Sequence, residues 1–453
     1  MIVMKFGGTS VANKEAIQRA ISIVRGRLDQ RPVVVVSAMS KVTDSLYRIA
    51  GEAAAQHEAE IASLLDQLRN RHIDTASELL ADSGHFLNEA ISDINTICDY
   101  LEKVALSVCA LGELSARSKA IIISQGEILS STIIAHAMNA YGIDTEWLDA
   151  RKMIISSGNP LNSDPIFSEI NARVPGIIEK GLKHAQAVIT QGFISSAIDG
   201  EPTVLGRGGS DYSASLIGMA INAEKIEIWT DVDGVRSADP RYIDNTLCLE
   251  QISFEEAAEM AHFGAKVLHP LTIEPAINKN IPILVLNSTN PQHPGTSIMG
   301  NDAIADGVKA VSWKEDILLI NIFSPKMINA TGFVQKVFKV FRDYNVSVDL
   351  ISTSEANISV TVAGQQNVDQ VVEHLSQFAE VHVFTDKSQV SIIGKNVINY
   401  GDVLQRLMNA LKGNNLYMIS QGASNINISF VVDRIDLTAI VNTIHSNLFA
   451  QQS

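Results

Sequence analysis

The first half of the chain alternates short apolar runs with helical patterns, and this alternation restricts the fold more than any other feature. Val33 to Val36 are four valines in a row, with no polar residue between them. A strand without polar–apolar alternation is typical of a parallel sheet that helices cover on both faces. Ala187–Gln191, Lys225–Thr230 and Ile281–Leu286 are similar short runs. Together they predict a three-layer αβα domain.

One long stretch departs from this alternation. Leu46 to about Ala140 has helical periodicity with few glycines or prolines. Because strand patterns resume only after it, we predict a helical insertion early in the αβα domain.

Beyond a turn-rich passage at Asn287–Asp306, the chain repeats itself. Two β-α-β-β-α patterns of roughly seventy residues follow one another. The second lacks a closing strand, and the strand candidate Gly307–Trp313 stands unassigned before the first. We predict that it completes the second module, which makes that module discontinuous. The predicted domains are residues 1–300, residues 315–386, and residues 307–314 joined with 387–453.

The segment Lys5–Ser10 reads Lys-Phe-Gly-Gly-Thr-Ser, after a hydrophobic stub and before a helical pattern. Gly7 and Gly8 allow main-chain N–H groups to approach an anion closely, and the two hydroxyl residues that follow add donors. Lys5 adds a full positive charge. The motif differs from the Gly-x-x-x-x-Gly-Lys-Ser/Thr loop, because its lysine precedes the glycines. It predicts a phosphate site, with a purely structural turn as the alternative.

The overall charge excludes some classes of partner. The net charge is −15 at pH 7, whereas nucleic acids and anionic membranes need clustered lysine and arginine. The apolar runs are too short to cross a bilayer, and the N-terminus lacks a secretory pattern. The three cysteines form no Cys-x-x-Cys pair, and we see no spacing typical of a structural metal site. We therefore expect a cytoplasmic protein with no nucleic-acid or membrane partner and no protein-held metal.

Two segments supply charges for a small ligand. Ser124–Glu127 is predicted to open a helix, where a carboxylate is either a capping charge or a ligand group. Gly206–Asp211 places Arg207 among three glycines, and arginine binds carboxylate or phosphate through two parallel hydrogen bonds. A structural turn needs no arginine, so we favour a binding role. Asp211 is predicted to be the N-cap of the next helix.

Two later segments belong to the same pattern. Thr230 and Asp231 follow a strand, and ligands bind α/β sheets at the carboxyl ends of parallel strands. A plain Asp-Gly turn is the alternative there. Arg241 follows in a second turn, and Phe263–Pro270 adds Lys266 beside a glycine.

Taken together, these motifs resemble the aspartate kinases of the amino acid kinase superfamily. The matching segments, in the family's order, are Lys5–Ser10, Gly206–Asp211, Trp229–Asp231 and Phe263–Pro270. The two terminal modules look like that family's paired ACT regulatory domains, which have ferredoxin-like βαββαβ folds. Acetylglutamate kinase, glutamate 5-kinase and nucleoside-monophosphate kinase relatives share the first domain. The helical insertion with a tandem ACT tail is similar to aspartate kinases alone, and the resemblance covers essentially the whole chain.

The resemblance implies transfer of the γ-phosphoryl group of ATP to the side-chain carboxylate of L-aspartate, giving 4-phospho-L-aspartate. A carboxylate with a reference pKa of about 3.9 is already ionised at neutral pH, so no general base is needed. The difficulty is repulsion between two anions, which cations and oriented N–H groups offset. Mg²⁺ is implied to enter with ATP, held mainly by phosphates.

The resemblance also assigns residues. Lys5, Gly7 and Gly8 would stabilise the transferring group, and Asp211 would hold Lys5 in place. The substrate residues would be Thr43, Glu127 for the α-ammonium, Arg207 for the α-carboxylate, and Ser210. The nucleotide residues would be Lys5, Gly8, Ser10, Thr230, Asp231, Arg236, Arg241, Lys266 and Val267. Arg236 stands where related chains carry an aromatic residue, so the adenine contact stays open.

The ACT pair is implied to sense an end-product amino acid, usually lysine and sometimes threonine. The matching effector positions are Met327, Asn329, Gly332, Phe333, Val334, Ser347, Val348, Asp349, Thr353, Ser354 and Glu355. Asp349 and Glu355 favour lysine, because carboxylates bind an ε-ammonium. Asp349 could instead face solvent at a strand end, and Asn329 replaces a histidine of some lysine-sensitive members. Edge-strand pairing of such modules implies at least a homodimer, with a tetramer as the alternative.

Three functions compete at this point. The first is an active, feedback-inhibited aspartate kinase. The second is an amino-acid-binding regulatory protein with an inactive kinase fold, which the intact Lys5, Glu127, Arg207 and Asp211 disfavour. The third is a fusion to homoserine dehydrogenase, for which the sequence contains no dinucleotide-binding region. We therefore predict a monofunctional aspartate kinase.

Overall fold

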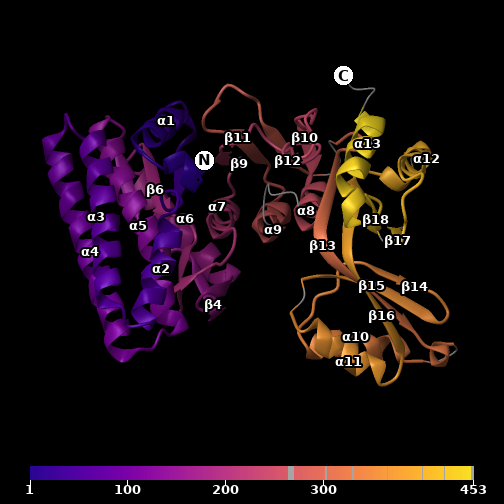
Figure 1. The fold of residues 1–453 in the computed structure, drawn as a ribbon. Coiled ribbons are helices and arrows are strands. Elements are labelled where there is room, and N and C mark those ends of the chain that lie inside the picture. The colour runs from indigo at the N-terminus through magenta and orange to yellow at the C-terminus, as the bar shows by residue number, and fades with distance from the viewer. Residues whose placement is uncertain are drawn as a thin grey trace. The chain divides into compact units, whose positions relative to one another are not determined.

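The computed structural model describes residues 1–263, 270–300, 304–328, 331–364, 366–399, 401–422 and 424–449 (Figure 1). The chain divides into two compact units. The first comprises 1–235, 250–254 and 267–301, and the second comprises 236–249, 255–266 and 302–453. Three of the predicted site residues, Lys266, Val267 and Asn329, lie outside the described residues.

Among the described residues, the first unit is built on an eight-stranded sheet with β1 (Ile2–Phe6) near its centre. Neighbouring strands pair in parallel except β11 with β12. In sheet order the other strands are β10 (Gln251–Ser253), β12 (Thr296–Met299), β11 (Ile283–Asn287), β9 (Ile226–Thr230), then beyond β1 the strands β2 (Pro32–Val36), β6 (Ala187–Gln191) and β3 (Thr145–Leu148). The predicted strands are thus confirmed as β2, β6, β9 and β11.

Helices cover both faces of this sheet, as the uninterrupted apolar strands predicted. Ile2, Met4 and Phe6 pack into a core shared with α1 to α5, whereas Val3 lies against Gly218 of α7. Successive strand residues point to opposite faces, so Lys5 faces α7 together with Val3. The helices of this unit outside the insertion are α1 (Lys14–Arg25), α6 (Phe167–Leu182), α7 (Gly209–Ala220) and α9 (Pro270–Lys279).

The predicted helical insertion is confirmed, and Figure 1 shows its long helices side by side. It consists of α2 (Val42–Ala54), α3 (Glu58–Leu79), α4 (Gly84–Leu111) and α5 (Ala116–Ala140). Within the described ranges α5 alone is long and apolar enough to span a membrane, but 89% of that apolar window is buried in the fold. It is therefore the central core helix.

The predicted start of this helix is wrong. Because α5 begins at Ala116, with Ser115 as its N-cap, Glu127 lies in mid-helix and is not a first-turn capping charge. The sequence pattern misled here because α5 is buried on nearly all sides, with Gln125 and Ser130 among its buried residues, and so gives no amphipathic signal for its boundary.

A small second sheet in this unit was not predicted. Its strands, in order, are β5 (Asn162–Pro165), β4 (Ile155–Asn159), β7 (Ile194–Ala197) and β8 (Pro202–Val204). They are short and rich in serine and other polar residues, so they carry little of the apolar alternation that predicts strands.

In its described residues, the second unit contains a six-stranded antiparallel sheet. The strands, in order, are β14 (Ile351–Thr353), β15 (Asn357–Ala363), β13 (Ala310–Phe323), β16 (Glu380–Ile393), β18 (Asn427–Asp433) and β17 (Met418–Gln421). The helices are α8 (Phe254–His262), α10 (Phe333–Asp343), α11 (Val368–Ser376), α12 (Gly401–Ala410) and α13 (Leu437–Phe449). α10 and α11 pack with one half of the sheet, and α12 and α13 with the other, around two separate cores. This confirms the predicted pair of ferredoxin-like modules.

The predicted end of the strand candidate Gly307–Trp313 is wrong. The strand continues past Trp313 as β13, and β16 likewise runs across the predicted domain boundary between residues 386 and 387; each strand has 14 residues. The chain is irregular at these points rather than broken: Asp316 and Asp386 have positive φ, and the β13–β16 register shifts after Lys314.

Candidate active site

A cleft of about 540 Å³ in the first unit brings together most of the residues predicted for substrate and phosphate. It lies at the carboxyl ends of β1 and β2, where parallel sheets bind ligands. The predicted residues that line it are Lys5, Gly7, Gly8, Thr43, Glu127, Ser210, Asp211 and Thr230. These residues come from segments far apart in the sequence, so the fold and not any one motif assembles the site.

Lys5 projects from β1 toward α7 and forms an ion pair there. Its Nζ is 2.6 Å from Oδ1 of Asp211, and both side chains are largely buried. The predicted capping role of Asp211 is wrong, because α7 begins at Gly209 with Gly208 at its N-cap. Asp211 lies instead in the first helical turn. A β-carbon built on Gly7 would lie 3.4 Å from Nζ, so the ammonium is next to the glycine turn.

The glycine turn packs directly against the loop that follows β2. The N–H of Gly7 donates to the Trp229 carbonyl at 3.1 Å, which ties the turn to β9. A β-carbon on Gly8 would come within 3.0 Å of the Ala38 carbonyl oxygen. Gly8 begins the short helix η1 (Gly8–Val11), whose first N–H groups have no intrahelical acceptor. A side chain at Gly8 would therefore strain the turn. The N–H groups at the start of η1, which have no intrahelical acceptor, suit an anion.

Glu127 is a buried carboxylate without a cationic partner among the described residues. Its residue is 3% exposed, and Oε2 has no hydrogen-bond partner. Burial raises the pKa of Glu127 to about 8. A buried carboxylate is costly unless a cation or further donors complete it. The group is therefore suited to receive an ammonium from a ligand in the cleft.

The remaining walls include residues that sequence analysis missed. Phe193, which has a positive φ, lines the cleft directly after β6. Ser210 packs closely on Gly192: a β-carbon built on Gly192 would lie 2.6 Å from the Cβ of Ser210. Lys41, also with positive φ, lines the rim before α2. The strands β2 and β6 were predicted, and ligands bind at the carboxyl ends of parallel strands. The residues in the loops after these strands could therefore have been included in the predicted site.

Arg207 is not among the residues lining the cleft, although its neighbours Gly206 and Gly208 are. It is exposed, and no hydrogen bond or ion pair joins it to another described residue. Its guanidinium is therefore available to a ligand. Ser10 differs: it is 2% exposed, and its hydroxyl lies 2.8 Å from Ser288 Oγ.

The other predicted nucleotide residues are not gathered in the cleft. Asp231 is exposed after β9 and accepts a hydrogen bond from Thr230 at 3.2 Å. Arg236 and Arg241 belong to the second unit. There Arg236 donates to Thr246, and Arg241 pairs with Asp239.

The predicted effector positions that are described lie in the second unit. Met327 is in η5 (Pro325–Met327), and Gly332 is the N-cap of α10, with Phe333 and Val334 following. Ser347 and Val348 precede β14, Thr353 is its last residue, and Ser354 and Glu355 follow it. Asp349 is buried, not solvent-facing: its side chain is 8% exposed and Oδ1 lies 3.1 Å from Lys314 Nζ. His262 Nε2 is 3.7 Å away, and Oδ2 has no hydrogen-bond partner.

Comparison with known proteins agrees with this fold and cleft. The amino acid kinase family model matches residues 1–287, and an ACT domain model matches residues 320–377 and 390–448. The chain is 35% identical over 464 residues to "Aspartokinase 1, chloroplastic" of Arabidopsis thaliana, covering 99% of this chain and 80% of that protein.

Two crystal structures of E. coli aspartokinase III are similar along almost the whole chain. The R-state, in complex with aspartate and ADP, gives a TM-score of 0.84 at 31% identity and covers 99% of this chain and 100% of that one. The T-state, in complex with lysine and aspartate, gives 0.80 at 31% identity and covers 99% of each. The chain therefore belongs to the aspartokinases, which join an amino acid kinase domain to ACT domains, and is an ATP-dependent kinase.

Proposed function

We propose that this chain transfers the γ-phosphoryl group of ATP to the side-chain carboxylate of L-aspartate, giving ADP and 4-phospho-L-aspartate. This product is the first intermediate of lysine, threonine and methionine biosynthesis. The observation that carries the proposal is one cleft that combines Lys5 beside a glycine turn with the buried carboxylate of Glu127. The first two suit a transferring phosphoryl group, and the last suits the ammonium of an amino acid.

The substrate is held at both of its α-substituents. Glu127 binds the α-ammonium, since its Oε2 has no partner within the described protein. Arg207, which is exposed beside the cleft, binds the α-carboxylate in a two-pronged contact. Thr43 and Ser210, which both line the cleft, donate hydrogen bonds to aspartate. The side-chain carboxylate is then the only unclamped group and points toward the glycine turn.

Charge compensation, not proton abstraction, promotes the reaction. The attacking carboxylate is already ionised, so the protein must reduce repulsion between it and the triphosphate. Lys5 stabilises the negative charge on the phosphoryl group in transfer, and the first N–H groups of η1, beginning at Gly8, add oriented dipoles. Asp211, 2.6 Å from Lys5, fixes the direction of the ammonium.

The nucleotide side is proposed from resemblance alone for several residues. Thr230 lines the cleft and supports this assignment. The other residues proposed to contact ATP are Ser10, Asp231, Arg236, Arg241, Lys266 and Val267. Mg²⁺ enters with ATP and is held mainly by phosphate oxygens.

A direct assay tests the proposal. Purified protein with ATP, Mg²⁺ and L-aspartate is incubated with hydroxylamine, which traps an acyl phosphate as a hydroxamate. We expect aspartyl hydroxamate to form only when all three components are present. A folded protein that binds lysine but forms no hydroxamate would instead support the inactive regulatory protein.

We further propose that an end-product amino acid, lysine rather than threonine, inhibits the enzyme through the ACT domains. The support is the lysine-bound T-state of the E. coli structure together with the buried Asp349 and the exposed Glu355. Separate titrations of lysine and threonine against activity test this. Inhibition by threonine alone would reject the lysine assignment.

The organisation of the chain is part of the same proposal. We propose domains at residues 1–300, 315–386, and 307–314 with 387–453. The pairing of Ala310–Lys314 with Gln389–Ile393 supports the discontinuous second ACT domain. The edge strands β14 and β17 support a homodimer through the ACT domains, with a tetramer as the larger form. We propose the cytoplasm as its location.

A further inference from the structure

Helix α5 and the loop after β2 meet at a single peptide group, the one that joins Ser37 to Ala38. The hydroxyl of Ser130 donates to the Ser37 carbonyl at 2.8 Å. The N–H of Ala38 faces the carboxylate of Glu127 and lowers its pKa, against the larger effect of burial. Glu127 and Ser130 are one helical turn apart on α5, so they project from the same face. One helix therefore holds both polar ends of the same peptide group.

The loop and the helix approach too closely for other side chains to intervene. A β-carbon on Gly126 would lie 2.9 Å from Ala38 Cβ and 3.1 Å from Val42 Cγ1. Ser130 is 1% exposed, so water does not compete for its hydroxyl. Its second contact, to the Glu127 carbonyl at 3.2 Å, is longer than the contact to Ser37. The Ser37 carbonyl is thus its main acceptor.

We propose that Ser130 is a positioning residue for the amino-acid substrate. By fixing the Ser37–Ala38 peptide, it keeps this wall of the cleft beside the Glu127 carboxylate, whose Oε2 has no partner and is left for the substrate ammonium. Ser130 does not line the cleft, so it acts through this peptide and through Glu127. The inference rests on the proposed function, in which Glu127 binds the α-ammonium.

The other side of the same loop has its own attachments. The Ser37 N–H donates to the Phe6 carbonyl at 3.1 Å, and the Ser40 N–H donates to the Gly8 carbonyl at 3.1 Å. Loss of the Ser130 hydroxyl leaves these bonds to the phosphate side in place. The defect should therefore appear in aspartate binding and not in ATP binding.

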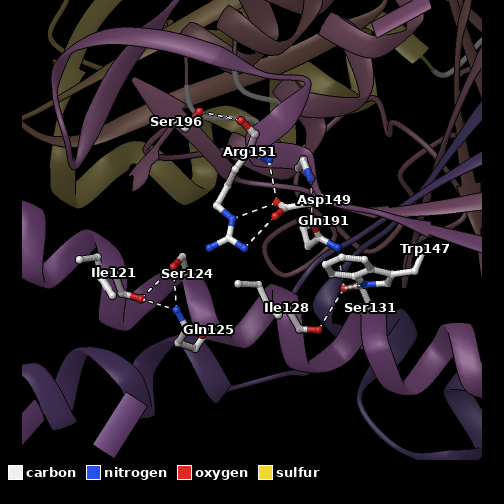
Figure 2. A network of polar contacts seen from close by, with 11 residues as sticks. Ile121, Ser124, Gln125, Ile128, Ser131, Trp147, Asp149, Arg151, Gln191 and Ser196 are labelled. Carbon is white, nitrogen blue, oxygen red and sulfur yellow. Dashed lines mark hydrogen bonds and ion pairs between the residues drawn. The ribbon is translucent and has the colours of Figure 1, made fainter. Parts of the chain in front are cut away.

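The next residue on the helix supplies a matched control. Ser131 is also fully buried, but its hydroxyl accepts hydrogen bonds from Trp147 at 3.0 Å and Gln191 at 2.9 Å (Figure 2). These partners lie on β3 and at the end of β6, not in the loop. Ser131→Ala therefore removes a buried hydroxyl from the same helix without touching the Ser37–Ala38 peptide.

The test compares steady-state constants of wild type, Ser130→Ala and Ser131→Ala in the hydroxamate assay. For Ser130→Ala we expect the KM for aspartate to rise roughly three- to tenfold, the effect of one lost hydrogen bond, with the KM for ATP unchanged and kcat nearly so. Ser131→Ala should keep the wild-type KM for aspartate even if it melts at a lower temperature. Equal aspartate KM values in wild type and Ser130→Ala, or equal rises in the two variants, would overturn the proposal.

A double-mutant comparison tests the route through Glu127. In a Glu127→Gln background, Ser130→Ala should change the dissociation constant of aspartate, measured by calorimetry, clearly less than it does in wild type. Fully additive effects would reject this route. If Ser130→Ala does not fold, Ser130→Cys has similar volume and a weaker donor, and is subject to the same criteria. An inactive wild type would instead refute the proposed function.

Discussion

Two buried carboxylates, one in each compact unit, are proposed to receive the ammonium of an amino acid, but they differ in what they contact now. Glu127 has no cation beside it among the described residues, and its Oε2 has no partner. Asp349 already has one: Lys314 Nζ lies 3.1 Å from Oδ1. Glu127, proposed to bind the substrate, is thus unpaired, whereas Asp349, proposed to bind the effector, is already paired with Lys314.

This difference implies two ways of binding the same chemical group. A buried carboxylate without a cation keeps a proton, so the substrate ammonium replaces a proton at Glu127. At Asp349 an effector ammonium must share the carboxylate with Lys314 or displace Lys314 from it, so this lysine is an internal competitor. Substrate binding should therefore depend on pH, and effector binding should depend on how firmly Lys314 is held.

The largest effect is expected for Lys5→Ala, which tests whether the two regions function separately. The change removes the cation beside the transferring group and leaves Asp211 unpaired. We expect kcat to fall by roughly 10²–10³-fold, the usual cost of losing an electrostatic stabiliser. Lysine affinity, measured by calorimetry, should stay at its wild-type value. A kcat within tenfold of wild type would remove Lys5 from the mechanism.

The next largest effect is expected when each of the two carboxylates is replaced in turn by the corresponding amide. Glu127→Gln should raise the KM for aspartate by about 10–100-fold, because a charge-assisted contact is lost. The concentration of lysine for half inhibition should not move. Asp349→Asn should do the reverse, with a higher half-inhibitory concentration and an unchanged KM. A variant that shifts both quantities equally would show that the two sites are not distinct.

The third effect follows from the pKa of Glu127, which burial raises to about 8. Below that pH the empty enzyme holds the proton, so the affinity for aspartate should rise about tenfold per pH unit from about pH 6 and level off near pH 8. An acid with a raised pKa in the folded state also makes the empty enzyme less stable as pH rises toward 8.

Glu127→Gln is the control for this pH dependence. Other titratable groups line the cleft, namely Lys5, Lys41, Asp44 and Asp211, and they remain in the variant. The slope of affinity against pH should therefore be lost in the variant if Glu127 is its source. A slope that persists would assign the proton to one of those groups.

The local part of this site was predictable, whereas the long-range part was not. The glycines and Lys5 form a continuous motif at the end of a strand, and a parallel strand end is a known ligand position. The mid-helix position of Glu127 was missed because α5 is buried on nearly every side, so its sequence gives no amphipathic signal for where the helix begins. The Lys314–Asp349 pair was missed because charge pairs between distant segments leave no periodic signal. For the same reason the Ser130 contact to Ser37 needed the structure.

The smallest effect is expected for Lys314→Met, which removes the internal competitor at Asp349. The variant leaves a buried carboxylate without its nearest cation, so an effector ammonium should bind it more favourably. We expect the half-inhibitory concentration of lysine to fall several-fold and lysine to raise the melting temperature more than in wild type.

Lys387 provides the matched control for this last change. It also pairs with a carboxylate, Asp433 at 2.6 Å. Each of the two lysines lies over an aromatic ring: Lys314 Nζ is 5.7 Å from the ring centroid of Phe263, and Lys387 Nζ is 4.3 Å from that of Tyr417. Lys387→Met should lower stability without changing inhibition by lysine. If Lys314→Met instead weakens inhibition, Lys314 supports the effector site and does not compete for it, and the contrast between an unpaired and an occupied carboxylate fails. If both variants tighten inhibition equally, the cause is a general loosening of the second unit and not the vacancy at Asp349.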